Sequence, residues 1–468
     1  MDMKRIAFGL TGVVLLTAPA AANDDPAHLS LVAGYKAAFT CSATFNAGRS
    51  ETEIAGDELH RIYQSYRDPM AALPDAEINK RKKTVSVTYS ETMPPRIAVW
   101  RPHLGCTQLP TGADMKMAKV LPRVKLSKER RKRSDQWPVG DAITGEIWTE
   151  TDEGARLSGV VGQAFDRLTF GEGTETTAVI VVRDGAIIAE QYRDGFDMHT
   201  PQRTWSVAKS IAATIFGAAV EADIVKPEEP AGLAVWSGNG DPRGTITFEN
   251  LMHMSSGLGQ LTAGNRTDAV YFGGGRVVDH AITNRLIATP GTRWRYANND
   301  TMAMMRGLHE KMGDDDAFLR FPFEAVLRPL GMTHTFLETD WNGDFILSSQ
   351  VWTTARDMAR LGLLYLNDGA FDGQRITPKG WSAYVATPAP DQPAPRREGD
   401  VPAGYGAQFW LYGEKHGLPE GTYAARGNRG QFLVIIPERN MLIVRRGFDD
   451  GGGFDLVRFT AEVLAAVE

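Results

Sequence analysis

Ser206 and Lys209 stand three residues apart at the start of an otherwise apolar segment, "TWSVAKSIAATIFGAAVEA" at 204–222. From Val207 onward this pattern predicts a helix that is buried on most of its surface. Residues i and i+3 share one helix face, so the amine can reach the hydroxyl. A buried lysine tends to lose its proton, and a neutral amine can activate a serine nucleophile. The alternative is a lysine whose stem packs on the core while its charge stays in water.

A second proton carrier is needed if this pair performs acyl transfer, because the leaving group must be protonated. The segment "PGTRWRYANND" at 290–300 offers Tyr296, which can serve if cations lower its pKa, and Asn298 on the same side of an extended loop. A second Tyr-x-Asn string, Tyr365 to Asn367, closes an amphipathic segment. We interpret that second string as core packing followed by a turn.

The third element is the glycine-rich string "ARGNRGQFLVIIP", which leads into a predicted strand. Gly427 and Gly430 indicate either a tight turn or a close approach of the backbone to a ligand. In the second case a substrate lies along the strand edge and the Gln431 N–H points into the site. The free backbone N–H groups at the helix start near Ser206, together with the Gln431 N–H, could then stabilise a developing oxyanion.

These three strings, in this order and rough spacing, resemble the serine β-lactamase and penicillin-binding superfamily. The resemblance covers roughly residues 146–468 and is strongest to the class C branch, with its 6-aminohexanoate-dimer hydrolases and related esterases. It includes the strings "LMHMSSGL" and "TTARDMARLGLLYLNDG". Each motif alone is common, but the combination is specific.

The resemblance implies a role for each candidate residue. Ser206 would be the nucleophile, Lys209 its base, and Tyr296 the proton shuttle. Asn298 would hold the substrate or the lysine. The backbone N–H groups of Ser206 and Gln431 would form the oxyanion hole.

The third motif departs from the superfamily pattern. Members that process β-lactams show Lys or His, then Thr or Ser, then Gly, whereas this chain has Asn428, Arg429 and Gly430. The cation and the hydroxyl that hold a carboxylate are absent there, and an arginine at the second position has a different geometry. We therefore expect esters or linear amides to be better substrates than β-lactams.

The order of elements predicts an α/β (α+β) fold. Strand patterns at "TTAVIVVRDGAIIAEQY", joined by a hairpin signal at Asp184-Gly185, and at "YGAQFWLY", "GQFLVIIP" and "MLIVRRGF" flank a helical middle. We expect an antiparallel sheet flanked by helices, with an inserted helical lobe, over residues 145–468. Residues 23–144, with strands at "TVSVTYSE" and "RIAVW", form an N-terminal extension.

The N-terminus carries Lys4 and Arg5, an apolar run and three alanines ending at Ala22. This is typical of a secretory signal peptide over residues 1–22 and predicts a periplasmic or secreted protein without a membrane span. In such a compartment the only two cysteines, Cys41 and Cys106, are expected to form a disulfide.

Composition limits the functional classes. The 468 residues are 43% hydrophobic and 23% charged, with a net charge of −6, which favours a folded protein and gives no support to nucleic-acid binding. The one dense basic run, 128–133, is interpreted as a solvated linker. No zinc or cofactor motif is found, so neither a metal nor a cofactor is expected. The oligomeric state stays open.

Two classes of function fit these observations. The first is a serine hydrolase that forms an acyl-enzyme on a small amide or ester, with β-lactamase or D,D-peptidase activity as the runner-up within that class. The second is a catalytically silent protein that binds cell-wall peptides through the same cleft. An intact Ser-Lys-Tyr set favours the enzyme, since a silent binder has no chemical need of it.

Overall fold

The structure is a computed structural model that describes residues 25–127, 134–143, 151–259, 268–395, 397–450 and 453–468. The predicted signal peptide and the basic run 128–133 lie outside the described residues. So does the stretch 144–150, where the boundary between extension and hydrolase region is expected. Among the helices of the described part, none is both long and apolar enough to cross a membrane.

Helices occur in the extension, in the middle of the chain and near its end. They are α1 (Pro26–Ala47), α2 (Glu51–Gly56), α3 (Gln64–Ala72), α4 (Asp152–Gln163), α5 (Val207–Glu221), α6 (Phe248–Met252), α7 (Asp268–Phe272), α8 (Val277–Ile282), α9 (Asn298–Met312), α10 (Asp315–Phe321), α11 (Ala355–Leu366), α12 (Trp381–Ala386) and α13 (Leu456–Ala466). A π-helical turn, η4 (Pro322–Leu327), continues α10. Short 3₁₀ turns complete the set: η1 (Met117–Lys119), η2 (Ala234–Trp236), η3 (Pro242–Thr245), η5 (Glu414–His416) and η6 (Pro437–Arg439).

Strands fall into a small N-terminal sheet, a large central sheet, a three-stranded sheet in the order β7-β9-β8 and a two-stranded sheet of β10 and β11. They are β1 (Glu77–Asn79), β2 (Thr84–Val87), β3 (Arg96–Arg101), β4 (Gly105–Gln108), β5 (Thr176–Arg183), β6 (Ala186–Tyr192), β7 (Gln202–Arg203), β8 (Phe336–Leu337), β9 (Val351–Thr353), β10 (Ala370–Phe371), β11 (Gln374–Arg375), β12 (Gly404–Tyr405), β13 (Trp410–Leu411), β14 (Tyr423–Gly427), β15 (Gln431–Ile436) and β16 (Met441–Gly447).

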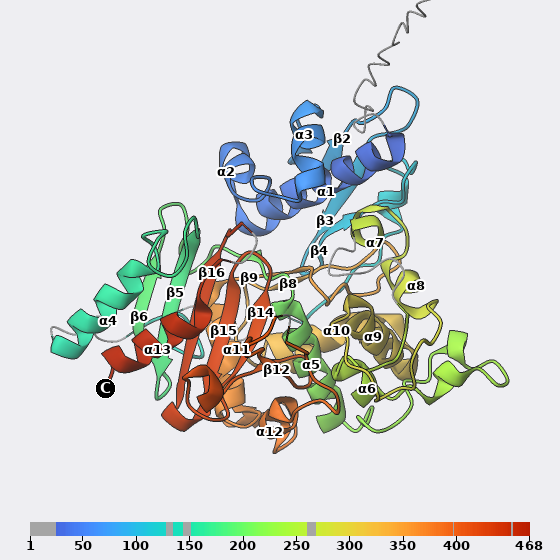
Figure 1. The fold of residues 1–468 in the computed structure, drawn as a ribbon. Helices are drawn as coiled ribbons and strands as arrows, with labels where there is room; N and C mark the ends of the chain where they lie inside the picture. Colours follow the sequence, from blue (N-terminus) through green and yellow to red (C-terminus); the bar gives the residue numbers. More distant parts are fainter. Residues whose placement is uncertain (1–24, 128–133, 144–150, 260–267, 396, 451–452) are drawn as a thin grey trace, which may run out of the picture.

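The central sheet has seven strands in the order β12-β13-β14-β15-β16-β5-β6, all paired antiparallel. Strands from the two ends of the hydrolase region therefore meet at the β16–β5 pair, where Figure 1 shows the green and red parts of the ribbon side by side. The predicted hairpin is present, with Asp184 and Gly185 both at positive φ, as a two-residue turn between right-twisted strands requires. The predicted antiparallel sheet is confirmed.

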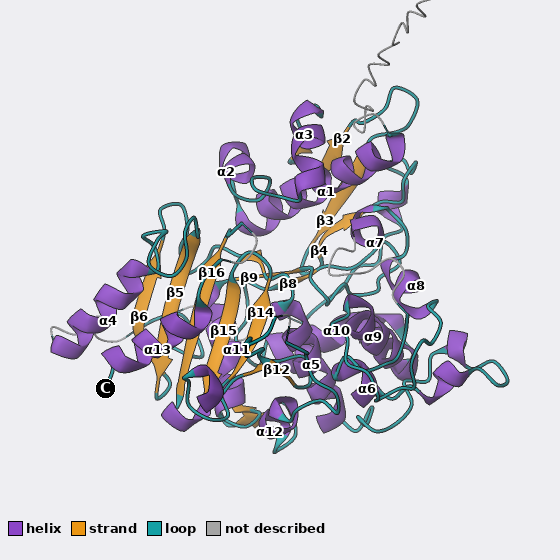
Figure 2. Ribbon diagram, viewed as in Figure 1, coloured by secondary structure: helices purple, strands orange, loops and turns teal. Residues whose placement is uncertain are grey.

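Helices cover both faces of this sheet (Figure 2). On one face α5 and α11 pack against β14, β15, β16 and β5, and their apolar side chains join the largest core cluster. On the other face α4 packs on α13, and a second cluster of apolar residues includes Leu157, Val161, Phe459 and Val463. The strands between these layers are buried on both sides, which explains why β5 and β15 read as continuous apolar runs.

The helical lobe predicted between the two groups of strands is also present. It contains α6 to α10, with α9 packed against α5, α6, α8 and α10. In Figure 1 this yellow and yellow-green lobe lies beside the sheet, with α5 at the boundary. The start of α5 is thus placed where sheet and lobe meet.

The N-terminal extension is a helix packed on a four-stranded antiparallel sheet in the order β1-β2-β3-β4. The predicted strands at "TVSV" and "RIAVW" are β2 and β3, whereas the 22-residue helix α1 was not anticipated from the sequence. A disulfide joins Cys41 of α1 to Cys106 of β4, with their Cα atoms 6.1 Å apart. The predicted disulfide is confirmed.

The extension packs directly on the hydrolase region. The buried Glu338 carboxylate accepts hydrogen bonds from the Ser42 hydroxyl at 2.5 Å and the Cys106 N–H at 3.2 Å. The Phe39 ring lies 5.8 Å from the ring of Trp205, the residue before Ser206. The extension is therefore close enough to influence the structure around the first motif.

Candidate active site

Ser206 immediately precedes α5, at the boundary between the central sheet and the helical lobe. The chain reaches it through β7, which pairs with β9, and through a hydrogen bond from the Thr204 N–H to the Val351 carbonyl at 2.8 Å. Trp205 then adopts φ +50°, a conformation that costs a non-glycine residue about 1–3 kcal/mol. The Arg203 guanidinium lies 4.1 Å from the Trp205 ring and 4.5 Å from the Phe39 ring, which holds this turn in place.

Lys209 is buried, with 1% of its surface exposed. Its Nζ donates to three oxygens: the Ser206 Oγ at 3.1 Å, the Asn298 Oδ1 at 2.6 Å and the Ser348 carbonyl at 2.7 Å. The structure therefore joins Ser206, Lys209 and Asn298 as the sequence predicts. It also excludes the alternative of a lysine whose charge reaches water.

Burial lowers the pKa of Lys209 from 10.5 to about 7. The three hydrogen-bond acceptors are neutral, so no carboxylate among them restores the charge on the amine. A base with a pKa near the working pH is half in its reactive form, which is what proton abstraction from a serine requires.

Tyr296 completes the cluster. Its ring centroid lies 5.0 Å from the Lys209 Nζ, and its ring packs against Tyr405 and Trp410 at 5.8 and 5.4 Å. Burial raises the pKa of Tyr296 well above 10, although a hydrogen bond with Ser206 opposes this shift. The condition that cations lower this pKa is not met, because burial outweighs the Arg426 charge. The phenol is therefore a proton donor at neutral pH.

The structure shows that the glycine of the third motif is three residues earlier in the chain than the sequence predicts. Gly427, not Gly430, lies against the nucleophile: a Cβ on Gly427 would come within 2.2 Å of the Thr204 carbonyl and 3.2 Å of the Ser206 N–H nitrogen. A Cβ on Gly430 would instead meet the Arg445 guanidinium at 1.8 Å, in a buried ion pair on the neighbouring strand. Gly430 is thus a packing glycine at the turn between β14 and β15.

Arg429 and Gln431 also have structural roles. The buried Arg429 guanidinium donates to the carbonyls of Asp57 and His60 in the extension, so it does not face a substrate. The Gln431 side-chain amide donates to the Gly447 carbonyl at 2.5 Å and its oxygen accepts from Arg446. Gln431 is paired with Gly427 across the ladder, which leaves Gly427 as the residue that faces Ser206.

Ala425 and Arg426, which precede Gly427, therefore occupy the positions where β-lactam-processing members of the superfamily carry a Lys or His and then a Thr or Ser. Ala425 is buried and carries neither group. Arg426 is charged, but its guanidinium donates to the Tyr412 hydroxyl at 2.7 Å and lies 5.5 Å from the Trp410 ring. Asn428, the first position of the predicted motif, is exposed beyond the strand end. Weak carboxylate binding stays a prediction, and its structural basis is now Ala425 and Arg426 instead of Asn428 and Arg429.

Sequence reasoning missed two contributions to this site. The Ser348 carbonyl holds Lys209, and the Ser348 hydroxyl is bonded to the Tyr271 hydroxyl at 2.5 Å. Trp410 supports the ring of Tyr296. A backbone carbonyl has no sequence signature, and aromatic residues of the core are too common to be distinguished by type.

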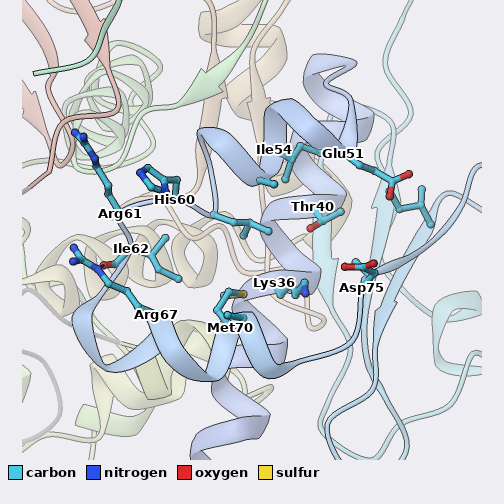
Figure 3. A pocket seen from close by; sticks show the side chains of 15 residues that line it. Lys36, Thr40, Glu51, Ile54, His60, Arg61, Ile62, Arg67, Met70 and Asp75 are labelled. Atoms are coloured by element: carbon cyan, nitrogen blue, oxygen red, sulfur yellow. Dashed lines mark hydrogen bonds between the residues drawn. The ribbon is translucent and has the colours of Figure 1, made fainter. Parts of the chain in front are cut away.

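A cavity of about 420 Å³ lies in the extension and not beside Ser206. Figure 3 shows it between α1, α3 and the loop of His60 and Arg61, with apolar side chains such as Ile62 and Met70 along its wall. Its lining contains no member of the Ser206 cluster. The reactive groups are therefore identified by their hydrogen-bond geometry and not by this cavity.

Comparisons with known proteins identify the family of this chain. The sequence pattern of the Beta-lactamase family matches residues 161–446. The 6-aminohexanoate-dimer hydrolase of Paenarthrobacter ureafaciens is 27% identical over 301 residues, which cover 58% of this chain and 73% of that protein. The chain belongs to the beta-lactamase family.

Solved structures show the same fold. A protein of Bacteroides dorei DSM 17855 assigned to the beta-lactamases has a TM-score of 0.55 and 21% identity, and the match covers 66% of this chain and 98% of that one. A family VIII carboxylesterase has a TM-score of 0.54 and 12% identity, with 68% and 97% covered. Fold and family together make the protein a serine hydrolase related to beta-lactamases, the class expected from its motifs.

Proposed function

We propose that the protein hydrolyses small linear amides or esters through an acyl-enzyme on Ser206. The observation that carries this proposal is the hydrogen bond between a buried lysine with a pKa of about 7 and the Ser206 hydroxyl at 3.1 Å. It supplies a nucleophile and a matched base at neutral pH.

In the acylation step the neutral Lys209 amine takes the hydroxyl proton as Ser206 Oγ attacks the substrate carbonyl. The oxyanion that forms is stabilised by the Ser206 N–H and by backbone N–H groups at the end of β14, next to Gly427. The Tyr296 phenol gives its proton to the leaving amine or alcohol, and the Lys209 ammonium returns a proton to the tyrosine. The bond to the leaving group breaks and the acyl group stays on Ser206.

Deacylation uses the same groups in reverse order. A water molecule attacks the acyl carbonyl while Tyr296 takes its proton and passes its own phenol proton to the neutral Lys209 amine. The Lys209 ammonium then gives that proton to Ser206 Oγ as the bond between Oγ and the acyl carbon breaks and the acid leaves. Asn298 holds the Lys209 amine beside the Ser206 hydroxyl, because the Asn298 Oδ1 accepts a hydrogen bond from the Lys209 Nζ at 2.6 Å. Its role is thus to position the base.

The substrate class follows from the strand beside the nucleophile and from the relatives. Ala425 offers no cation to a substrate carboxylate, and Arg426 is engaged with Tyr412. Loss of a charge-assisted hydrogen bond costs about 1.5–3 kcal/mol, or roughly tenfold to a hundredfold in rate. The relatives named as a 6-aminohexanoate-dimer hydrolase and a carboxylesterase support amides and esters over β-lactams.

We also propose that the mature chain works in the periplasm or outside the cell. The signal-peptide pattern of residues 1–22 and the Cys41–Cys106 disulfide both suit an oxidising compartment.

The decisive experiment is turnover of p-nitrophenyl esters and linear amides with detection of an acyl-enzyme by intact mass. The wild type should show a mass increase equal to the acyl group, and Ser206→Ala should show neither this adduct nor turnover. Lys209→Ala should lose nearly as much activity, because groups that act as one unit do not contribute additively. A folded Ser206→Ala protein that still turns over esters would reject Ser206 as the nucleophile, whereas a wild type with neither adduct nor turnover would reject the proposal and leave the silent binder as the better explanation.

A further inference from the structure

Three metal-binding side chains from distant parts of the sequence meet away from Ser206. Asp141 precedes the hydrolase region, His199 lies in the connection from β6 to β7, and His334 lies between η4 and β8. One ligand atom from each residue lies within 4.8 Å of the other two. The spacing of these residues along the chain matches no metal motif, so a site here could not be predicted from the sequence.

The two imidazole rings lie next to each other. Their ring centroids are 4.9 Å apart at an angle of 33°. His199 Nδ1 is shielded from solvent and has no hydrogen-bond partner in the described part of the chain, and the Asp141 Oδ2 lies 3.9 Å from it. A shielded nitrogen without a partner is costly unless something binds it. His334 Nδ1 lies 3.3 Å from the Thr333 hydroxyl, a contact that orients the ring for binding through Nε2.

The charges around the cluster leave room for a cation. Arg360 donates to Asp141 Oδ1 at 2.7 Å and to Asp357 at 2.9 Å, so the second Asp141 oxygen faces the histidines. Arg356 is paired with both oxygens of Glu190. The carboxylates of Asp141, Asp357 and Glu190 carry three negative charges, and the guanidiniums of the two arginines carry two positive charges. The net charge of this group is therefore −1, which favours binding of a divalent ion.

We propose that Asp141, His199 and His334 form a binding site for a divalent transition-metal ion, with Zn²⁺ as the best match. Two imidazole nitrogens and one carboxylate oxygen are a donor set that Zn²⁺ accepts, with bonds of about 2.0–2.2 Å. Bonds of this length around one ion bring ligand atoms closer together than 3.9 Å, so small side-chain rotations close the site around it. The His199 side chain is 35% exposed, which gives water access to a fourth position.

The bound ion would join Asp141 to two segments that support the nucleophile. His199 lies three residues before β7, which leads directly to Ser206, and His334 lies two residues before β8, which shares β9 with β7. Because the cluster does not include the Ser206, Lys209 or Tyr296 side chains, the ion would stabilise this framework without entering the chemistry.

Zn²⁺ binding to tag-free mature protein tests the proposal. After treatment with a chelator, titration with ZnCl₂ followed by calorimetry and native mass spectrometry should show one ion bound per chain, and Zn²⁺ should raise the melting temperature. Loss of a residue that only hydrogen-bonds a metal ligand lowers metal affinity by about 10- to 100-fold. Loss of a ligand itself should cost more, so His199→Ala and His334→Ala should each weaken Zn²⁺ binding by at least about 100-fold. His280→Ala, an exposed histidine on α8, is the matched control and should bind as the wild type does.

Asp141→Asn keeps an oxygen for Arg360 but removes the charge, so it separates ligand loss from unfolding. Its near-ultraviolet circular dichroism should match the wild type while Zn²⁺ binding weakens. Co²⁺ should give the visible absorption of a low-coordinate site in the wild type and lose it in the three variants. Absence of binding at micromolar Zn²⁺, or equal binding by the His199→Ala/His334→Ala double variant, would overturn the proposal.

Discussion

Asn298→Asp should move the pH dependence of hydrolysis without changing the shape of the site. Asn298 Oδ1 lies 2.6 Å from the Lys209 Nζ, and both side chains are buried. The substitution exchanges an amide for an isosteric carboxylate and therefore places a negative charge against the amine. A neighbouring anion favours the protonated form of a lysine, so its pKa must rise.

The size of the shift follows from the distance. Two unit charges about 3 Å apart at an effective dielectric constant of about 20 attract each other by about 5 kcal/mol, which corresponds to roughly 4 pKa units. Desolvation of the new carboxylate offsets part of this energy, so a rise of at least about 2 units is expected. The pKa of Lys209 would move from about 7 to about 9 or higher.

The consequence is a loss of activity that alkaline pH restores. At pH 7 the neutral fraction of the amine falls from about one half to about one in a hundred, so kcat/KM should fall about 50-fold. The wild-type profile of kcat/KM for a p-nitrophenyl ester should rise through an apparent pKa of about 7, and the variant profile should rise through a value about 2 units higher.

Asn298→Ala is the control, because it removes the acceptor without adding charge. It should lower kcat and leave the acidic limb of the profile near its wild-type position or below it. A wild-type profile with no limb near pH 7, or an Asn298→Asp profile that coincides with it, would refute Lys209 as the base.

Three further outcomes test other parts of the structure. Gly427→Ala should reduce kcat/KM for an ester by about 100-fold or more, because its Cβ would displace the backbone of the nucleophile. Gly430→Ala should instead lower the free energy of unfolding, measured by chemical denaturation, by about 2 kcal/mol or more and leave the kcat/KM of the folded protein unchanged. Cys41→Ser together with Cys106→Ser should lower the free energy of unfolding by about 4 kcal/mol, measured by urea titration, and thiol labelling of the denatured, unreduced wild type should find no free thiol. Nitrocefin should be hydrolysed with a much lower kcat/KM than a p-nitrophenyl ester; a preference for nitrocefin means that Ala425 and Arg426 do not limit carboxylate binding.

Local patterns in the sequence were sufficient for the elements that depend on neighbouring residues. The apolar run after Ser206 predicted the buried helix α5, and the Asp184-Gly185 turn predicted the β5–β6 hairpin. The i, i+3 spacing of Ser206 and Lys209 predicted their contact, because a helix fixes that geometry regardless of what surrounds it. The same holds for the order of strands and helices, which predicted one sheet built from both ends of the region.

The register of the third motif could not be read from the sequence. "ARGNRGQ" contains two glycines three residues apart, and either could follow the two positions of a cation and a hydroxyl. Which one touches the nucleophile depends on how β14 pairs with β15 and where that pair ends, and this pairing is a contact between chain segments. The structure selects Gly427 because only its missing Cβ makes room for the backbone at Ser206.

The electrostatic state of the site was likewise a property of the tertiary structure. The sequence named Tyr296 and left open whether cations lower its pKa, whereas in the structure aromatic packing from β12 and β13 buries the ring and raises the pKa. For Lys209 the sequence predicted burial correctly, but the Ser348 carbonyl that holds its amine comes from a loop more than a hundred residues away. Residue types and helical spacing therefore determined which groups can react. Long-range packing decided their protonation, their backbone partners and the strand edge that a substrate meets, because desolvation and strand pairing depend on every segment that packs around the site.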